Sequence, residues 1–350
     1  MDEPPPVDER LQTGAPKRAG RGPIGTAASL VLALAILAAA GGFSLMYGLH
    51  AGDWAEPRVR DFVFWQLRLP RLLMGLLVGA TLSIVGAAFQ TLFQNPLATP
   101  STVGTTAGAT LGALFSLVLG LESTFALSAV TLCSFAGALC TSALVLALAS
   151  RKTVSIEEIL LAGIAVTLGS GAIAQGLHTI ADASTLFSAA KWSLGQLPQV
   201  GFQRLAVLAV PALVCASVIL SQRKSLLVLG LGEERARSVG VETERVRLWV
   251  LIAGCLGVGA SVALCGPIAF VGLLVPHLVR LAVGPPGVSF LVLCWWWGGA
   301  FLVTCDTLAH FAFPGRELPV GVITASLGSP ALFLLILRGR GGSSWRTSVG

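Results

Sequence analysis

Long, uncharged, apolar runs alternate with short polar segments along this chain. The runs cover residues 22–52, 72–121, 123–150, 159–181, 205–222, 248–279, 281–305 and 318–337. A helix needs about 20 apolar residues to cross a bilayer, so several runs are long enough for two helices. The runs lack the period-two alternation of a barrel strand, and we therefore predict that helices are the spanning elements.

Proline motifs divide the two longest runs. The segment N-P-L-A-T-P (95–100) holds two prolines that are too close for one regular helix, and Gly266-Pro267 interrupts the later run. The pattern then predicts ten transmembrane helices, at about 25–48, 68–93, 104–120, 124–149, 155–180, 204–222, 246–266, 269–282, 288–312 and 319–338.

The composition supports an all-α polytopic membrane protein. Hydrophobic residues make up 54% of the 350 and charged residues only 11%, whereas a soluble domain carries about 25% charged residues. Seven cysteines all lie in apolar runs without a CxxC pair, so we interpret them as small buried hydrophobic residues. No metal site or bound cofactor is expected.

The order of elements predicts two pseudo-symmetric halves. Each half has a Gly-rich helix, a proline-marked break and then a short helix, at 104–120 and 269–282. Repeats of this kind are common in transporters. We expect residues 1–22 to be a disordered tail, residues 23–338 to form the membrane domain and residues 339–350 to be a second tail.

The distribution of Lys and Arg predicts the orientation. Ten helices put both termini on one side, which receives sixteen of these residues against seven on the other. The positive-inside rule therefore places both termini in the cytoplasm, together with the polar segment 222–247.

That polar segment is the densest cluster of charge in the chain. It holds ten of the forty charged residues: Arg223, Lys224, Glu233, Glu234, Arg235, Arg237, Glu242, Glu244, Arg245 and Arg247. Gly232 and Gly240 bracket a helix-like core. The chain has no G-x-x-x-x-G-K-[ST] loop, so ATP-driven transport would need an ATPase on another polypeptide. We interpret the segment as a surface for a partner.

Ionisable residues at the apolar helices allow several interpretations. Asp306 is the carboxylate placed deepest in a predicted helix, with His310 one turn beyond it; a structural hydrogen-bonding role is favoured over a catalytic or metal-binding one. Arg68 and Arg71 stand at the outer end of the second helix, either as interfacial anchors or as a docking site for carboxylates.

Small residues in the second helix predict close helix packing. Gly75, Gly79 and Ser83 follow one another at i, i+4 spacing, which lets helix backbones approach. Packing is favoured here over direct contact with a substrate.

A set of motifs, in order, resembles the FecCD-type permeases of bacterial ABC importers, which carry ferric siderophores, haem and cobalamin. The motifs are R-L-P-R-L-L-M-G-L-L-V-G-A (68–80), Q-x4-N-P-L-A (90–98), L-L-A-G (160–163), L-G-L-G-E-E-R-A-R-S-V-G-V (229–241), G-P-I-A-F-V-G-L-L-V-P-H-L-V-R (266–280), Asp306 and E-L-P-V-G-V-I-T-A-S-L-G-S-P (317–330). The likeness extends from about residue 50 to residue 338.

The resemblance implies a type II ABC importer permease fold in the bacterial inner membrane. It implies a homodimer or a heterodimer of paralogous permeases, two cytoplasmic ATPase subunits that use ATP and Mg, and a periplasmic or lipid-anchored binding protein. A ferric siderophore is the expected cargo, with haem or cobalamin as alternatives. A nucleic-acid partner is not expected.

The resemblance also implies roles for particular residues. Coupling to the ATPase would fall to Gly232, Glu233, Glu234, Arg235, Arg237, Ser238 and Gly240. Docking of the binding protein would fall to Arg68 and Arg71, and to Arg316 if it replaces an arginine often found at the position of His310. The translocation path and its packing would involve Gly75, Gly79, Ser83, Asn95, Pro96 and Asp306.

Two other classes of function compete with this interpretation. A secondary transporter driven by an ion gradient would use Asp306 and His310 as a proton site. A membrane-embedded enzyme would need a nucleophile elbow, an H-E-x-x-H motif or a dinucleotide fingerprint, and the sequence contains none of these.

Overall fold

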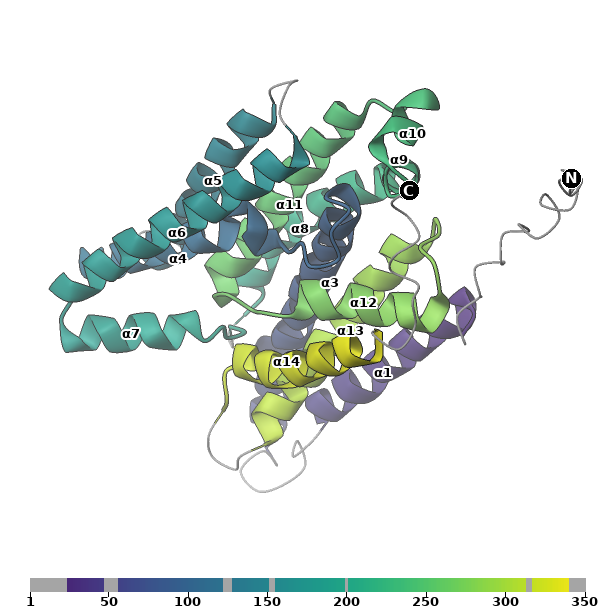
Figure 1. The fold of residues 1–350 in the computed structure, drawn as a ribbon. Helices are drawn as coiled ribbons and strands as arrows, with labels where there is room; N and C mark the ends of the chain where they lie inside the picture. Colours follow the sequence, from purple (N-terminus) through teal and green to yellow (C-terminus); the bar gives the residue numbers. More distant parts are fainter. Residues whose placement is uncertain are drawn as a thin grey trace, which may run out of the picture.

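The computed structural model describes residues 24–46, 56–121, 128–150, 155–198, 201–312 and 317–339, and these residues are predominantly helical. The expected tails at 1–22 and 339–350 lie outside them, except for Gly339, which ends α14. The elements, shown in Figure 1, are α1 (Thr26–Met46), α2 (Pro57–Phe62), the π-helical η3 (Val63–Arg68), α3 (Leu69–Leu92), the 3-10 turn η4 (Pro100–Val103), α4 (Thr105–Val118), α5 (Ala129–Ala149), α6 (Ile156–Ile180), α7 (Ala183–Ser193), α8 (Phe202–Ser221), α9 (Arg223–Leu229), α10 (Glu233–Ser238), α11 (Thr243–Cys265), α12 (Val271–Val283), α13 (Phe290–Phe311) and α14 (Val320–Gly339).

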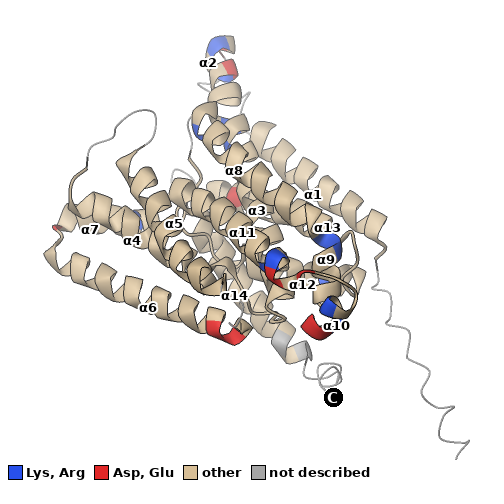
Figure 2. Cartoon of the chain, turned by 90° about the horizontal axis from the view of Figure 1, so that it is seen from above, with Lys and Arg blue, Asp and Glu red and all other residues tan. Residues whose placement is uncertain are grey.

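The predicted all-helical membrane fold is confirmed. Within the described residues, seven helical segments are long and apolar enough to cross a membrane, and α4, α12 and α14 provide three shorter apolar helices. These ten segments coincide with the ten predicted from the sequence. Figure 2 shows charged residues gathered around α2, around α9 and α10 and at the start of α6, whereas the long helices between them carry few.

The second membrane helix begins earlier than predicted. The expected start was residue 68, but α2, η3 and α3 form one continuous helical segment from Pro57 to Leu92. Proline is favourable in the first helical turn, where its missing N–H has no partner to lose. The charges of Arg58, Arg60 and Asp61 concealed this extension because an apolar pattern stops at them. Helix α7 was also not predicted.

Helices α3 and α11 form the buried centre of the bundle. Most of each is inaccessible, and α3 contacts α8, α11, α12 and α13. Gly79 and Gly298 face one another so closely that a Cβ on either would overlap the carbonyl oxygen of the other. Gly86 meets the carbonyl of Gly272 in the same way. Small residues therefore set the distance between α3 and its neighbours α13 and α12.

Candidate functional site

The polar segment between α8 and α11 folds into two short helices, α9 and α10. Gly232 precedes α10 with φ of 122°, and Gly240 follows it with φ of 82°. Residues other than glycine rarely adopt such positive φ values. Ala236, in the middle of α10, is fully buried. The two glycines and this small anchor make α10 a compact knob at the end of the bundle.

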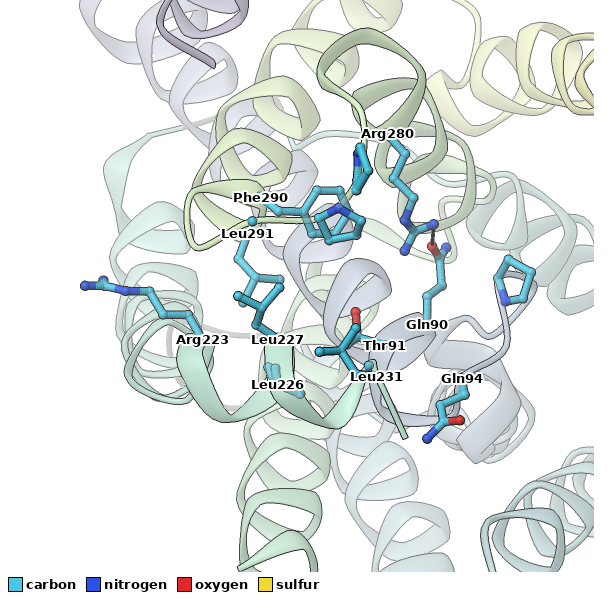
Figure 3. A pocket seen from close by; sticks show the side chains of 15 residues that line it. Gln90, Thr91, Gln94, Arg223, Leu226, Leu227, Leu231, Arg280, Phe290 and Leu291 are labelled. Atoms are coloured by element: carbon cyan, nitrogen blue, oxygen red, sulfur yellow. Dashed lines mark hydrogen bonds between the residues drawn. The ribbon is translucent and has the colours of Figure 1, made fainter. Parts of the chain in front are cut away.

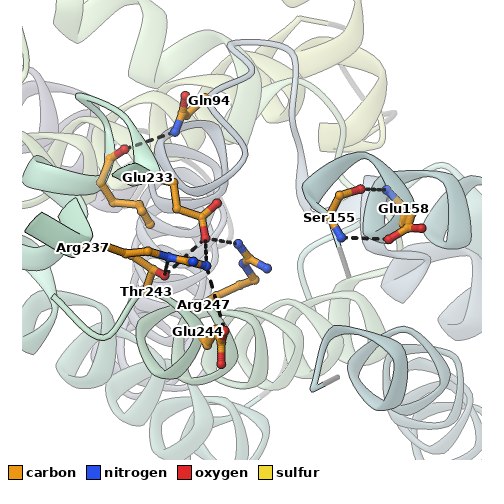
Figure 4. A network of polar contacts seen from close by, with 9 residues as sticks. Gln94, Ser155, Glu158, Glu233, Arg237, Thr243, Glu244 and Arg247 are labelled. Carbon is orange, nitrogen blue, oxygen red and sulfur yellow. Dashed lines mark hydrogen bonds and ion pairs between the residues drawn. The ribbon is translucent and has the colours of Figure 1, made fainter. Parts of the chain in front are cut away.

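Glu233 fastens that knob to α11. Its Oε1 accepts hydrogen bonds from the Arg237 guanidinium at 2.9 Å, the Arg247 guanidinium at 3.1 Å and the Thr243 hydroxyl at 3.2 Å (Figure 4). Arg247 is buried, and Glu233 is partly buried. The bond from Arg237 lies within α10, whereas those from Thr243 and Arg247 hold α10 against the first turns of α11. Glu233 therefore faces into the protein, where it stabilises the knob.

The outer face of α10 combines charge with apolar side chains. Glu234, Arg235 and Ser238 are exposed, and the Ser238 hydroxyl donates to the Arg235 carbonyl at 2.9 Å. Leu231 and Val239, on either side of the knob, are 65% and 67% exposed. The sequence analysis overlooked these two residues, although apolar side chains inside so polar a segment were a detectable signal of a contact surface.

The break after α3 packs beside this knob. Asn95 Oδ1 accepts the N–H of Leu97 at 2.9 Å and closes a turn, while Pro96 follows it directly. Gln94 has φ of 47°, and its Nε2 donates to the Leu229 carbonyl at 3.3 Å. Asn95 and Pro96 thus lie at the end of α3 that is linked to α9, which places them near the knob.

A second polar cluster lies at the opposite end of α3. Arg71 forms a bidentate ion pair with Asp306, with both N–O distances 2.9 Å, and also contacts Glu317 at 3.0 Å. The Arg71 and Asp306 side chains are only 14% and 8% exposed. His310 Nδ1 lies 3.0 Å from the other oxygen of Glu317. Because Arg71 engages both carboxylate oxygens, Asp306 is a structural partner joining α13 to α3.

The two arginines expected at the outer mouth are thus both used inside the chain. Arg68 donates to the carbonyls of Ser44 and Leu45 at 3.2 and 2.9 Å, which ties η3 to the end of α1. Arg71 is held by its carboxylates, as described above. Arg316 lies outside the described residues. Docking of a binding protein by these arginines stays a prediction. Arg71 could take part only if it exchanged Asp306 or Glu317 for a carboxylate of that protein.

A cavity of about 660 Å³ adjoins the Arg71 cluster. Arg71, Lys191 and Arg204 contribute positive charge to its lining, against the single carboxylate of Glu317. Trp192, on α7, supplies an aromatic wall. Lys191 and Arg204 were not singled out from the sequence because they belong to different helices, and only the tertiary structure brings them to one cavity.

In the part of the chain that the structure describes, no group of three or more His, Cys, Asp or Glu side chains is arranged to hold a metal ion. Cys215, Cys255, Cys265, Cys294 and Cys305 are buried and free.

Comparison with known proteins identifies relatives over nearly the whole length. The model of the FecCD transport family matches residues 26–338. The vitamin B12 import system permease protein BtuC of Klebsiella pneumoniae subsp. pneumoniae is 35% identical over 294 residues, or 83% of this chain and 86% of that protein. BtuC of Vibrio cholerae serotype O1 is 36% identical over 303 residues, or 84% and 90%.

Solved structures show the same architecture. An inward-facing conformation of a metal-chelate type ABC transporter aligns with a TM-score of 0.80 and 28% identity, covering 88% of this chain and 98% of the other. PsaBC from Streptococcus pneumoniae in complex with Fab aligns with a TM-score of 0.54 over 83% and 93% of the two chains. At 17% identity, this second likeness concerns the fold alone.

Proposed function

The chain belongs to the FecCD transport family and is a multi-pass permease subunit of an ABC importer, and from this premise we propose that it carries a large metal chelate across the inner membrane. Hydrolysis of ATP, with Mg, belongs to two separate subunits beneath the permease. Two permeases, identical or paralogous, enclose the path, and a periplasmic or lipid-anchored binding protein delivers the cargo.

The knob formed by α10 is the proposed contact with the ATPase. The supporting observation is its construction: Glu233 fastens it to α11 through Thr243 and Arg247, and the bond from Arg237 to the same oxygen stiffens α10 itself. A rigid knob can pass the closure of an ATPase on to the membrane helix as a movement of the whole unit. Exposed Glu234 and Arg235, with Leu231 and Val239 beside them, offer charged and apolar contacts to the partner.

The cavity beside Arg71 is the proposed docking site for the binding protein. Arg71, Lys191 and Arg204 give it a net positive lining, which suits carboxylates on a docking protein. In this proposal Arg68 and Arg71 anchor the mouth, and the exposed Lys191 and half-buried Arg204 add charge that was not assigned to docking from the sequence. His310 contributes to this docking site by its contact with Glu317, which also pairs with Arg71.

We propose a corrinoid, the cobalt chelate of the vitamin B12 class, as the first cargo to test. The names of the relatives at 33–36% identity support this choice. The ferric siderophore predicted from the sequence is the alternative cargo, and similarity to a metal-chelate type ABC transporter is compatible with both. Both are large chelates. We therefore expect the binding protein to select between them, while the permease carries either one by the same mechanism.

Transport in reconstituted vesicles tests the proposal. The permease, its cognate ATPase and its binding protein are placed in proteoliposomes with ATP inside or outside, and uptake of cyanocobalamin and of ferric siderophores is followed. ATP-dependent accumulation of one chelate is expected. Uptake that persists without the ATPase and responds to a proton gradient would instead support the secondary transporter, for which Asp306 offers little because Arg71 engages both its oxygens.

A further inference from the structure

A cavity of about 360 Å³ lies beside α9, between the ends of α3, α12 and α13. In Figure 3 the side chain of Arg280 reaches towards Gln90 within this cavity, whereas Arg223 points away from it. Leu226, Leu227, Phe290 and Leu291 contribute apolar walls. The cavity is thus a largely apolar space with the Arg280 guanidinium in its wall.

Arg280 has few partners for a partly buried cation. One nitrogen donates to Gln90 Oε1 at 2.7 Å, and the guanidinium carbon lies 5.0 Å from the centre of the Phe290 ring. Gln90 is itself held by its Nε2, which donates to the Gly272 carbonyl at 3.2 Å. Within the described part of the chain, no carboxylate forms an ion pair with Arg280.

This arrangement favours a bound anion. Arginine presents five N–H donors in a planar fork, and the Gln90 amide occupies one of them. A charge withdrawn from water is costly unless a counter-ion or hydrogen bonds compensate for it. The cavity therefore has unused donors and unbalanced positive charge.

The position of the cavity at one end of the helix bundle indicates which kind of anion it binds. Arg280 lies in the last turn of α12 and Gln90 in the last turn of α3, at the end of the bundle that carries α9 and α10. The count of Lys and Arg places this end on the cytoplasmic side. Lipid phosphates lie at the ends of membrane helices, and basic pockets between such helices on the cytoplasmic side bind anionic headgroups.

We propose that this cavity binds the phosphate of an anionic phospholipid from the cytoplasmic leaflet. The phosphate oxygens accept from the remaining Arg280 donors, for which a guanidinium is well suited. The acyl chain lies along the leucine and phenylalanine walls. The proposal rests on the proposed function only for the presence and orientation of the bilayer. Because α9 forms part of the wall, the lipid would also brace α9, and with it α10, against α12 and α13.

Native mass spectrometry of the delipidated permease in detergent tests this site. Phosphatidylglycerol and phosphatidylcholine with matched acyl chains are titrated separately. Both carry a phosphodiester, but the choline cation offsets its charge, so phosphatidylglycerol, with its net negative charge, is expected to bind about tenfold more tightly. Arg280→Gln should remove that preference, and Arg280→Lys should retain part of it.

Two further variants separate the site from general effects of charge and folding. Arg245→Gln removes an equal charge from an exposed position at the same end and should leave the lipid preference unchanged. Leu227→Trp fills the cavity while keeping Arg280, and it should weaken binding of phosphatidylglycerol to a similar extent. If Arg280→Gln does not fold, as judged by thermal unfolding, Leu227→Trp decides the question.

Several results would overturn the proposal. One is a wild-type permease without headgroup preference, and another is equal lipid affinity in Arg280→Gln and Arg245→Gln. Displacement of the lipid by inorganic phosphate at an equal concentration would show a free-phosphate site, because the apolar walls would then contribute nothing. Lipid binding that is unaffected by Leu227→Trp would place the lipid outside this cavity. Arg280 would then be available to pair with a carboxylate of a protein partner. Since binding is measured on the permease alone, failed uptake and failed lipid binding are separate results.

Discussion

The polar clusters at the two ends of α3 are built in different ways. Glu233 gathers partners that lie 4, 10 and 14 residues away, so its cluster is local and stays together when the knob moves. Arg71 joins carboxylates that lie 235 and 246 residues away and is largely buried. The first cluster stiffens one movable unit, whereas the second ties distant helices together. Loss of the second should therefore cost more stability, and loss of the first should act more on coupling.

Removing Arg71 is expected to have the largest effect. Arg71→Leu leaves Asp306 as a buried, unpaired charge, and the free energy of unfolding should fall by about 3–5 kcal/mol. Asp306→Leu should cost less, because Arg71 keeps Glu317. Denaturant unfolding in detergent measures both, with exposed Arg58→Leu as the control. Equal losses in Arg71→Leu and Arg58→Leu would show that the ion pair does not hold the helices.

Weakening the Glu233 cluster should have a smaller and local effect. Glu233→Gln removes the charge that three donors share, and the local stability of α10 should fall by about 1.5 kcal/mol. Hydrogen exchange should accelerate in α10 and at the start of α11 and stay unchanged in α3 and α13. Exchange that accelerates equally across the bundle would contradict the local character of this cluster.

Exchanging charges on the outer face of the knob should separate stability from coupling. In Glu234→Arg/Arg235→Glu the free energy of unfolding should change by no more than about 0.5 kcal/mol, because both side chains are exposed. ATP hydrolysis stimulated by the loaded binding protein should fall several-fold if the knob contacts the ATPase. Arg245→Gln, on α11, is the control. Unchanged stimulation would remove the coupling role of these two residues.

The smallest effect is expected at Asp182, which caps α7 far from both clusters. Hydrogen bonds from the Ser184 hydroxyl and from Thr185 lower the pKa of this carboxylate to about 2. A lowered folded-state pKa means that its contribution is complete above the unfolded pKa of about 3.9 and is lost as the pH falls towards 2. Thermal unfolding should therefore show a difference between wild type and Asp182→Asn that changes only below about pH 4. A difference that changes near pH 7 would refute this assignment.

Much of the architecture could be predicted because apolar patterning determines where membrane helices form. The break at Asn95-Pro96 and the one at Gly266-Pro267 were found correctly, since two prolines close together, or a proline after a glycine, disfavour a continuous helix. Single prolines are tolerated, because Pro211 and Pro276 lie inside α8 and α12. The extension back to Pro57 was missed because charges such as Arg58 and Arg60 interrupt the apolar pattern of a helix that extends beyond the membrane. The short helix α7 was missed for a related reason, as it lacks a long apolar run.

The candidate sites were less predictable. The exposed side chains Glu234, Arg235 and Ser238 were recognised as a surface because charge density is visible in the sequence. That Glu233 faces inward could not be inferred, since it depends on the angle between α10 and α11. The sharing of Arg71 between Asp306 and Glu317 was equally hidden, because hundreds of residues separate these partners.

The sequence by itself determined that this chain is a helical membrane protein, where its breaks fall and which segment carries the densest charge. These properties follow from local hydrophobicity, from the rigid ring of proline and from charge, all of which act on nearby residues. Only the tertiary structure decided which charges are paired and which remain available. Arg71 is neutralised by distant carboxylates, whereas Arg280 is placed beside Gln90 and Phe290 in a cavity without a carboxylate among the described residues. That distinction depends on which helix ends meet, because pairing requires atoms within a few ångströms.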